Sequence, residues 1–127
     1  MNSNFKVAFA TNDGVTTFAH FGRAKYFEVI EVKDGNIISR ERRNKPDFHS
    51  THTHDHNHHG NHAERHNIIY SLVEDCDFVI AAGMGYGIYD FLISKGKQPI
   101  VTTEKNIEDA LKELQEGKLF NHTEKLH

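Results

Sequence analysis

The stretch DFVIAAGMGYGIYDFLISKG, residues 77–96, decides the fold class that we predict for this chain. Residues 77–82 are short and apolar, which is typical of a buried strand. The glycine-rich turn at residues 83–87 leads into apolar positions at helical spacing, and Gly96 is placed to end that helix. A strand, a tight turn and a helix in this order form the repeating unit of α/β proteins with parallel strands.

Similar units lie on both sides of this stretch. Residues 62–74 carry apolar side chains at helical spacing, which predicts a helix before it. Residues 98–102 (QPIVT) predict a short strand after it. Asn106 can then cap a final helix, which Gly117 ends.

The first half of the chain has the pattern of three strands. Residues 5–10 (FKVAFA) predict a buried strand, while residues 26–32 (YFEVIEV) and 36–43 (NIISRERR) flank an Asp-Gly pair that is typical of a hairpin. The full order is therefore β-β-β-α-β-α-β-α. It predicts a three-layer α/β/α fold around a mixed five-stranded sheet, in the order 3-2-1-4-5 with strand 2 antiparallel. Residues 119–127 are expected to form a loosely held tail.

Length and composition bound the class of protein. A chain of 127 residues, 37% hydrophobic and 26% charged, suits one soluble domain over residues 1–127. A formal charge of −3 gives no reason to expect a nucleic-acid partner, and no apolar run could cross a membrane. The first residues lack the pattern of a signal peptide, and the single Cys76 cannot form an internal disulfide. These features predict a cytoplasmic protein.

The histidine content is the one anomaly of the composition. The chain has 11 histidines, and most of them fall in a loop inserted at about residues 44–62 and in the helix that follows. Neutral imidazoles bind zinc, copper, nickel and iron, and two of them at positions i and i+4 of a helix can hold one metal. A passive polar linker is the alternative. The candidate metal ligands are His20, His52, His54, His56, His58, His59, His62 and His66.

The predicted topology places a ligand site at one edge of the sheet. In open α/β sheets, ligands bind beyond the carboxyl ends of the strands where the strand order reverses, which here lies between strands 1 and 4. The loop at residues 11–25, the histidine-rich loop, the glycine-rich turn and the loop at 102–105 all emerge there. The helix N-termini at this edge favour an anion. Cys76 lies at the opposite edge and is not expected to be a ligand.

Two motifs at that edge allow two interpretations each. In the first interpretation, the segment AHFGRA, residues 19–24, offers an imidazole and a guanidinium to a ligand. In the second, Phe21 closes the end of the sheet and His20 is only solvated. The turn GMGYG likewise either presents backbone N–H groups to an anion and the soft sulfur of Met84 to a metal, or has glycines that only allow the strand and the helix to pack tightly.

Four segments carry a resemblance to a known family. KVAFATNDG, HFGRAKYFEVIEV, DFVIAAGMGYG and NIEDALKELQEGKL together resemble the dinitrogenase iron–molybdenum cofactor biosynthesis family, the NifX type that is also appended to NifB. The resemblance covers nearly the whole chain except the histidine-rich loop and the last residues. It implies a ribonuclease-H-like fold and a protein that binds or carries an iron–sulfur or iron–molybdenum cluster without turnover. The cofactor-binding residues that it implies are His20, Phe21, Gly22, Arg23, Gly83, Met84 and Gly85.

Two other functions are weighed against this one. The histidine-rich loop could make the chain a metallochaperone or store for nickel, zinc, copper or cobalt. A metal-dependent nuclease needs clustered carboxylates, but the first strand carries none and Asp13 lies beyond its end. We therefore expect a non-catalytic protein whose partners are a metal or cluster and a cofactor-assembly or acceptor protein.

Overall fold

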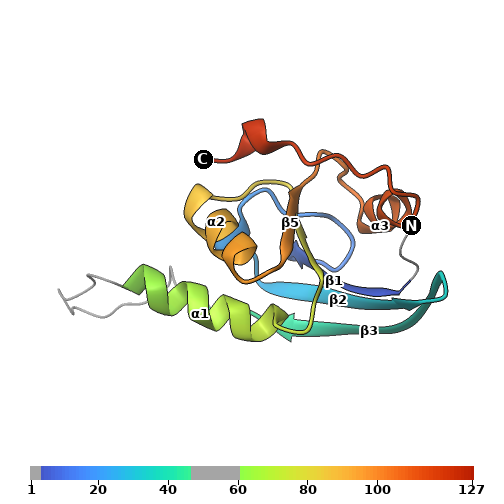
Figure 1. Cartoon of the computed structure of the whole chain (residues 1–127), viewed down its shortest axis with the longest axis horizontal. Helices are drawn as coiled ribbons and strands as arrows, with labels where there is room; N and C mark the ends of the chain where they lie inside the picture. Colours follow the sequence, from blue (N-terminus) through green and yellow to red (C-terminus); the bar gives the residue numbers. More distant parts are fainter. Residues whose placement is uncertain (1–3, 47–60) are drawn as a thin grey trace.

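The computed structural model describes residues 4–46 and 61–127, and the side chains of α1 from Glu64 onward. Every predicted strand and helix is present, with ends within a few residues of those expected. The elements in chain order are β1 (Phe5–Thr11), η1 (Phe21–Arg23), β2 (Tyr26–Lys33), β3 (Asn36–Asn44), α1 (Asn61–Val73), β4 (Phe78–Ala81), α2 (Tyr86–Ser94), β5 (Gln98–Val101), α3 (Ile107–Gln115) and η2 (Thr123–Lys125) (Figure 1).

The sheet has the predicted topology. Its strand order is β3-β2-β1-β4-β5, with β2 antiparallel to both of its neighbours. β1 pairs with β4, and β4 with β5, in parallel. The carboxyl ends of β1, β3, β4 and β5 therefore share one edge, and the predicted fold class is confirmed.

Helices cover both faces of the sheet because side chains of a strand alternate between its faces. On one face, buried residues of α1 and α2, such as Val73 and Leu92, join a core cluster with Ala8. On the other face, Ile107 of α3 packs in a second cluster with Phe9. Burial on both faces explains why β1 reads as a nearly continuous apolar run. No helix of the described residues is long and apolar enough to span a bilayer.

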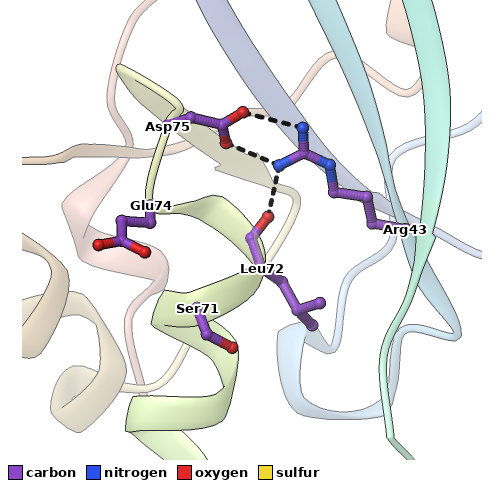
Figure 2. A pocket seen from close by; sticks show the side chains of 5 residues that line it. All are labelled: Arg43, Ser71, Leu72, Glu74 and Asp75. Carbon is purple, nitrogen blue, oxygen red and sulfur yellow. Dashed lines mark hydrogen bonds and ion pairs between the residues drawn. The ribbon is translucent and has the colours of Figure 1, made fainter.

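Two arginines of the edge strand β3 hold the helix layers in place. Arg40 pairs with Glu28 of β2 at 2.6 Å and with Glu108 of α3 at 2.7 Å. Arg43 donates to the carbonyl of Leu72 at 2.8 Å and pairs with Asp75 at 2.7 Å (Figure 2). This contact holds the pKa of the Asp75 carboxyl well below its usual range.

Residues 119–127 are docked on the sheet, so the expectation of a loosely held tail was wrong. Asn121 accepts a hydrogen bond from the Val101 amide at 2.9 Å and donates to the Tyr89 hydroxyl at 2.8 Å. Leu126 packs against the core that includes Met84. The tail supplies partners for the open edge of β5, and it passes from there toward the start of α2 (Figure 1).

Candidate functional site

A cavity of about 570 Å³ lies at the carboxyl edge, beside the point where the strand order reverses between β1 and β4. It is bounded by η1, by α1, by the first turn of α2 and by the end of the docked tail. The lining residues are Phe21, Gly22, Arg65, His66, Ile69, Gly85, Tyr86, Gly87, Ile88 and His127.

Backbone bonds join the loop after β1 to the turn after β4. The Ala82 amide donates to the Phe18 carbonyl at 2.9 Å, and the Phe21 amide donates to the Gly83 carbonyl at 3.2 Å. A Cβ on Gly83 would lie only 2.0 Å from the Ala19 carbonyl oxygen. A glycine at this position therefore allows the two chain segments to approach closely.

Phe21 and Met84 belong to the core under the cavity. Phe21 is 2% exposed, and its ring centroid lies 5.5 Å from that of Phe27 at the end of the sheet. Met84 is fully buried, which places its sulfur inside the core and away from the cavity surface. From the glycine-rich turn, Gly85 does line the cavity.

His20 and Arg23 flank the cavity-lining residues of η1 but are exposed on the surface beside them. The His20 ring meets the Phe18 ring edge-on, with 5.8 Å between their centroids. The structure thus gathers four of the residues singled out from the sequence at the cavity. They are Phe21, Gly22, His66 and Gly85.

His66 packs against α2 at the cavity. Its ring centroid lies 5.2 Å from that of Phe91, and the missing side chain of Gly87 leaves room for the imidazole beside the first turn of α2.

The histidine-rich loop falls outside the described residues, so the predictions for His52, His54, His56, His58 and His59 are not tested. His62 lies in the first turn of α1, but its side chain is also not described. Within the described part of the chain, no three His, Cys, Asp or Glu side chains are grouped to hold a metal ion. A site with three such ligands would need donors from residues 47–63 or from the ligand itself.

The side chains that line the cavity favour a negative ligand. Among the described residues, no carboxylate side chain lines it, whereas Arg65, two imidazoles and the first turn of α2 do. Lys45 adds a buried charge behind the wall, where its ammonium donates to the carbonyls of Gly22 at 3.1 Å and Ala24 at 3.3 Å. Sequence reasoning missed Lys45 because nothing in its local sequence signals burial.

Comparison with known proteins identifies the family of this chain. Residues 3–117 match the sequence profile of the family described as "Dinitrogenase iron-molybdenum cofactor". The chain belongs to this family. The resemblance seen in the sequence is thereby confirmed, while a comparison with curated proteins found no match.

Solved structures show the same fold at low sequence identity. A candidate dinitrogenase from Methanocaldococcus jannaschii is 18% identical with a TM-score of 0.66, and the match covers 93% of this chain and 94% of that one. The apo form of the orange protein from Desulfovibrio gigas is 14% identical with a TM-score of 0.68, covering 91% of each chain. A candidate NifB protein from Thermotoga is 20% identical with a TM-score of 0.62, covering 94% of each chain.

In this member of the dinitrogenase cofactor family, Asp13 has a structural role. Its carboxylate accepts hydrogen bonds from the amides of Thr16 and Val15, each at 2.8 Å, and from the Thr16 hydroxyl. These bonds, with the Thr16 amide contributing most, lower the pKa of Asp13 to about 2. The carboxylate thus orders the loop after β1.

Cys76 lies at the opposite edge of the sheet, just before β4, as the sequence predicts for a residue that is not a ligand. It is 1% exposed, and burial raises the pKa of its thiol to about 12. Because the thiolate is the form that binds metals, this cysteine is not suited to hold a cluster.

A second depression, of about 620 Å³, lies at the end of α1 and includes Arg43, Ser71, Leu72, Glu74 and Asp75 in its lining (Figure 2). The Arg43 guanidinium donates hydrogen bonds to the Asp75 carboxylate and to the Leu72 carbonyl. Because two carboxylates, Glu74 and Asp75, are in its lining, this surface suits an anionic ligand less well than the cavity beside α2.

Proposed function

We propose that this chain is a non-catalytic carrier or assembly protein for an iron–sulfur or iron–molybdenum cluster, which it binds in the cavity beside α2. The observation that carries the proposal is the combination of size and charge. A volume of about 570 Å³ is that of a small-ligand site, and its described lining has cationic and imidazole side chains but no carboxylate side chain.

Membership of the dinitrogenase cofactor family supports this choice of ligand class. Such clusters are anionic, so Arg65 and the N-terminal turn of α2 are suitable contacts. The imidazole of His66 can coordinate iron, and the apolar side chains of Phe21 and Ile69 exclude water and strengthen these polar interactions.

The cysteine content favours a carrier over a protein with a resident cluster. Permanently bound iron–sulfur clusters are held mainly by cysteine thiolates, and the only cysteine of the chain is Cys76 at the far edge. Binding through charge, shape and imidazole is weaker, and it allows the ligand to be passed to an acceptor protein.

Of the cofactor-binding residues implied by the family resemblance, Phe21, Gly22 and Gly85 are on the cavity wall. His20 and Arg23 are exposed and neighbour Phe21 and Gly22 in the chain. In this proposal they contact the part of a cluster that projects from the cavity. Gly83 and Met84 contribute from beneath, by keeping the two loops together.

The second candidate function is a metallochaperone or store for nickel, zinc, copper or cobalt. It is favoured by the density of histidines in the loop at about residues 44–62. Because this loop leads into α1, a metal bound there would be close in sequence to His66 at the cavity.

Elemental analysis distinguishes the two functions. The protein is purified without oxygen, reconstituted with iron, sulfide and molybdate, and compared with His66→Ala, His20→Ala and a variant lacking residues 47–60. A carrier should be brown and contain iron and sulfide, should lose at least half of both in His66→Ala, and should keep them when the loop is deleted. His122→Ala, outside the cavity lining, is the matched control.

The opposite pattern would identify the metal store. In that case the protein is colourless, holds nickel, zinc, copper or cobalt in stoichiometric amounts, and loses the metal only when the loop is deleted. Failure of the reconstituted wild type to retain iron, sulfide or molybdenum would contradict the cluster proposal.

A further inference from the structure

Residues 121–127, called the strap below, run from β5 to the glycine-rich turn that begins α2. Leu126 forms a parallel bridge with Met84. The His127 amide donates to the Met84 carbonyl at 3.2 Å, and the Tyr86 amide donates to the His127 carbonyl oxygen at 2.9 Å. The strap thus occupies the Tyr86 N–H, one of the backbone N–H groups of the glycine-rich turn.

The strap also forms part of the cavity. His127 lines it, and the His127 main-chain oxygen would lie 3.6 Å from a Cβ on Gly85. Tyr86 is the first residue of α2, and its N–H has no acceptor within the helix. A ligand that enters deeply at this wall contacts the strap, and the Tyr86 N–H is already bonded to His127.

The two ends of the strap are held differently. At its start, Asn121 bonds to Val101 and Tyr89, and the His122 amide donates to the Val101 carbonyl at 2.8 Å. The middle, Thr123–Lys125, is exposed and its main-chain bonds run to neighbouring strap residues.

The tip consists of Leu126 and His127. It is held by two main-chain bonds and by one half-buried leucine side chain. The docked strap therefore makes more bonds to the rest of the fold at its root, residues 121–122, than at its tip, so the tip can open while the root stays in place.

We propose that the strap is a gate on the cavity, which an anionic cluster must displace at its tip in order to bind fully. This inference rests on the proposed carrier function. The gate selects its ligand by chemistry, because only a ligand with acceptor atoms can replace the His127 oxygen at the Tyr86 N–H. It also weakens the apparent affinity by the fraction of molecules with the tip closed, which makes release to an acceptor easier.

Titration with tetrathiomolybdate, a coloured molybdenum–sulfur dianion, tests the gate. The wild type is compared with a variant lacking residues 123–127, which keeps the root, and with Leu126→Ala. We expect the truncation to bind the dianion up to about tenfold more tightly, as for a site that is closed in roughly nine molecules of ten, although it also removes the His127 imidazole. Leu126→Ala, which keeps that imidazole, should also bind more tightly than the wild type. Lys118→Ala, an exposed change before the strap, should bind like the wild type.

Amide hydrogen exchange gives an independent readout in the wild type. Addition of tetrathiomolybdate should speed exchange of the His127 amide, which loses its bond to the Met84 carbonyl, and should leave exchange of the His122 amide in the root unchanged. If the truncation does not fold, as judged by its melting transition, Leu126→Ala and the exchange experiment still test whether the strap gates the cavity.

Each alternative outcome overturns a specific statement. Binding that is equal or weaker in the strap variants, or slower exchange of the strap with the dianion present, would overturn the gate and leave the carrier function standing. If neither the wild type nor any variant binds the dianion, this ligand class is wrong for the cavity and both proposals fall.

Discussion

Replacement of Gly83 by alanine should destabilise the protein strongly. The added Cβ would lie 2.0 Å from the carbonyl oxygen and 3.1 Å from the carbonyl carbon of Ala19. Both atoms belong to the backbone, so the loop after β1 has to move by more than an ångström. That movement breaks the bonds that join Ala82 to Phe18 and Phe21 to Gly83.

The magnitude follows from these contacts. Two backbone hydrogen bonds contribute about 1 kcal/mol each, and buried groups left without partners cost about 1–3 kcal/mol more. We therefore expect Gly83→Ala to lower the free energy of unfolding by about 3–5 kcal/mol. Urea unfolding followed by circular dichroism measures this change.

Gly87→Ala is the matched control. Its Cβ would lie 3.5 Å from the His66 ring, an ordinary contact, and the change adds a better helix former within α2. We expect a gain of up to about 1 kcal/mol. A loss below about 1 kcal/mol for Gly83→Ala would show that the two loops can separate freely, and the packing argument for this edge would be refuted.

Three further predictions concern residues away from that contact. Lys45→Met removes the ammonium that donates hydrogen bonds to the Gly22 and Ala24 carbonyls, so it should lower the free energy of unfolding by about 1–3 kcal/mol. An unchanged urea midpoint would contradict this. The pKa of Asp13 is lowered from 3.8 to about 2, so its contribution to stability is complete above about pH 5 and is lost as the pH falls through about 2. The difference in melting temperature between wild type and Asp13→Asn should therefore shrink over that window, and a constant difference would argue against it. Burial raises the pKa of the Cys76 thiol to about 12, so a thiol reagent at pH 8 should label it only after addition of denaturant, and rapid labelling of the folded protein would contradict the predicted burial.

The sequence predicted the strands and helices because turn and cap signals act over only a few neighbouring residues. The Asp34-Gly35 pair forms the turn of the hairpin, with φ angles of 52° and 79° that suit a two-residue loop. Asn106 caps α3 as predicted, and its side-chain oxygen accepts from the amides of Glu108 and Asp109. With the strand order known, the chain connectivity was enough to place a cavity at the carboxyl edge.

The composition of the cavity wall needed the tertiary structure. Met84 was expected at the wall and is buried, while Lys45 was overlooked and lies behind it. The tail was expected to be loose and is docked, with Asn121 bonded to a strand 20 residues earlier in the chain. No short pattern marks such residues as buried or docked.

The sequence by itself thus determined the elements, their order and the edge of the sheet where a ligand can bind, because apolar periodicity, turns and caps are properties of neighbouring residues. Only the tertiary structure decided which side chains face the cavity, that Lys45 is buried, and that residues 121–127 cover the start of α2. These features depend on contacts between segments far apart in the chain, and each such contact is set by how the whole sheet and its helices pack.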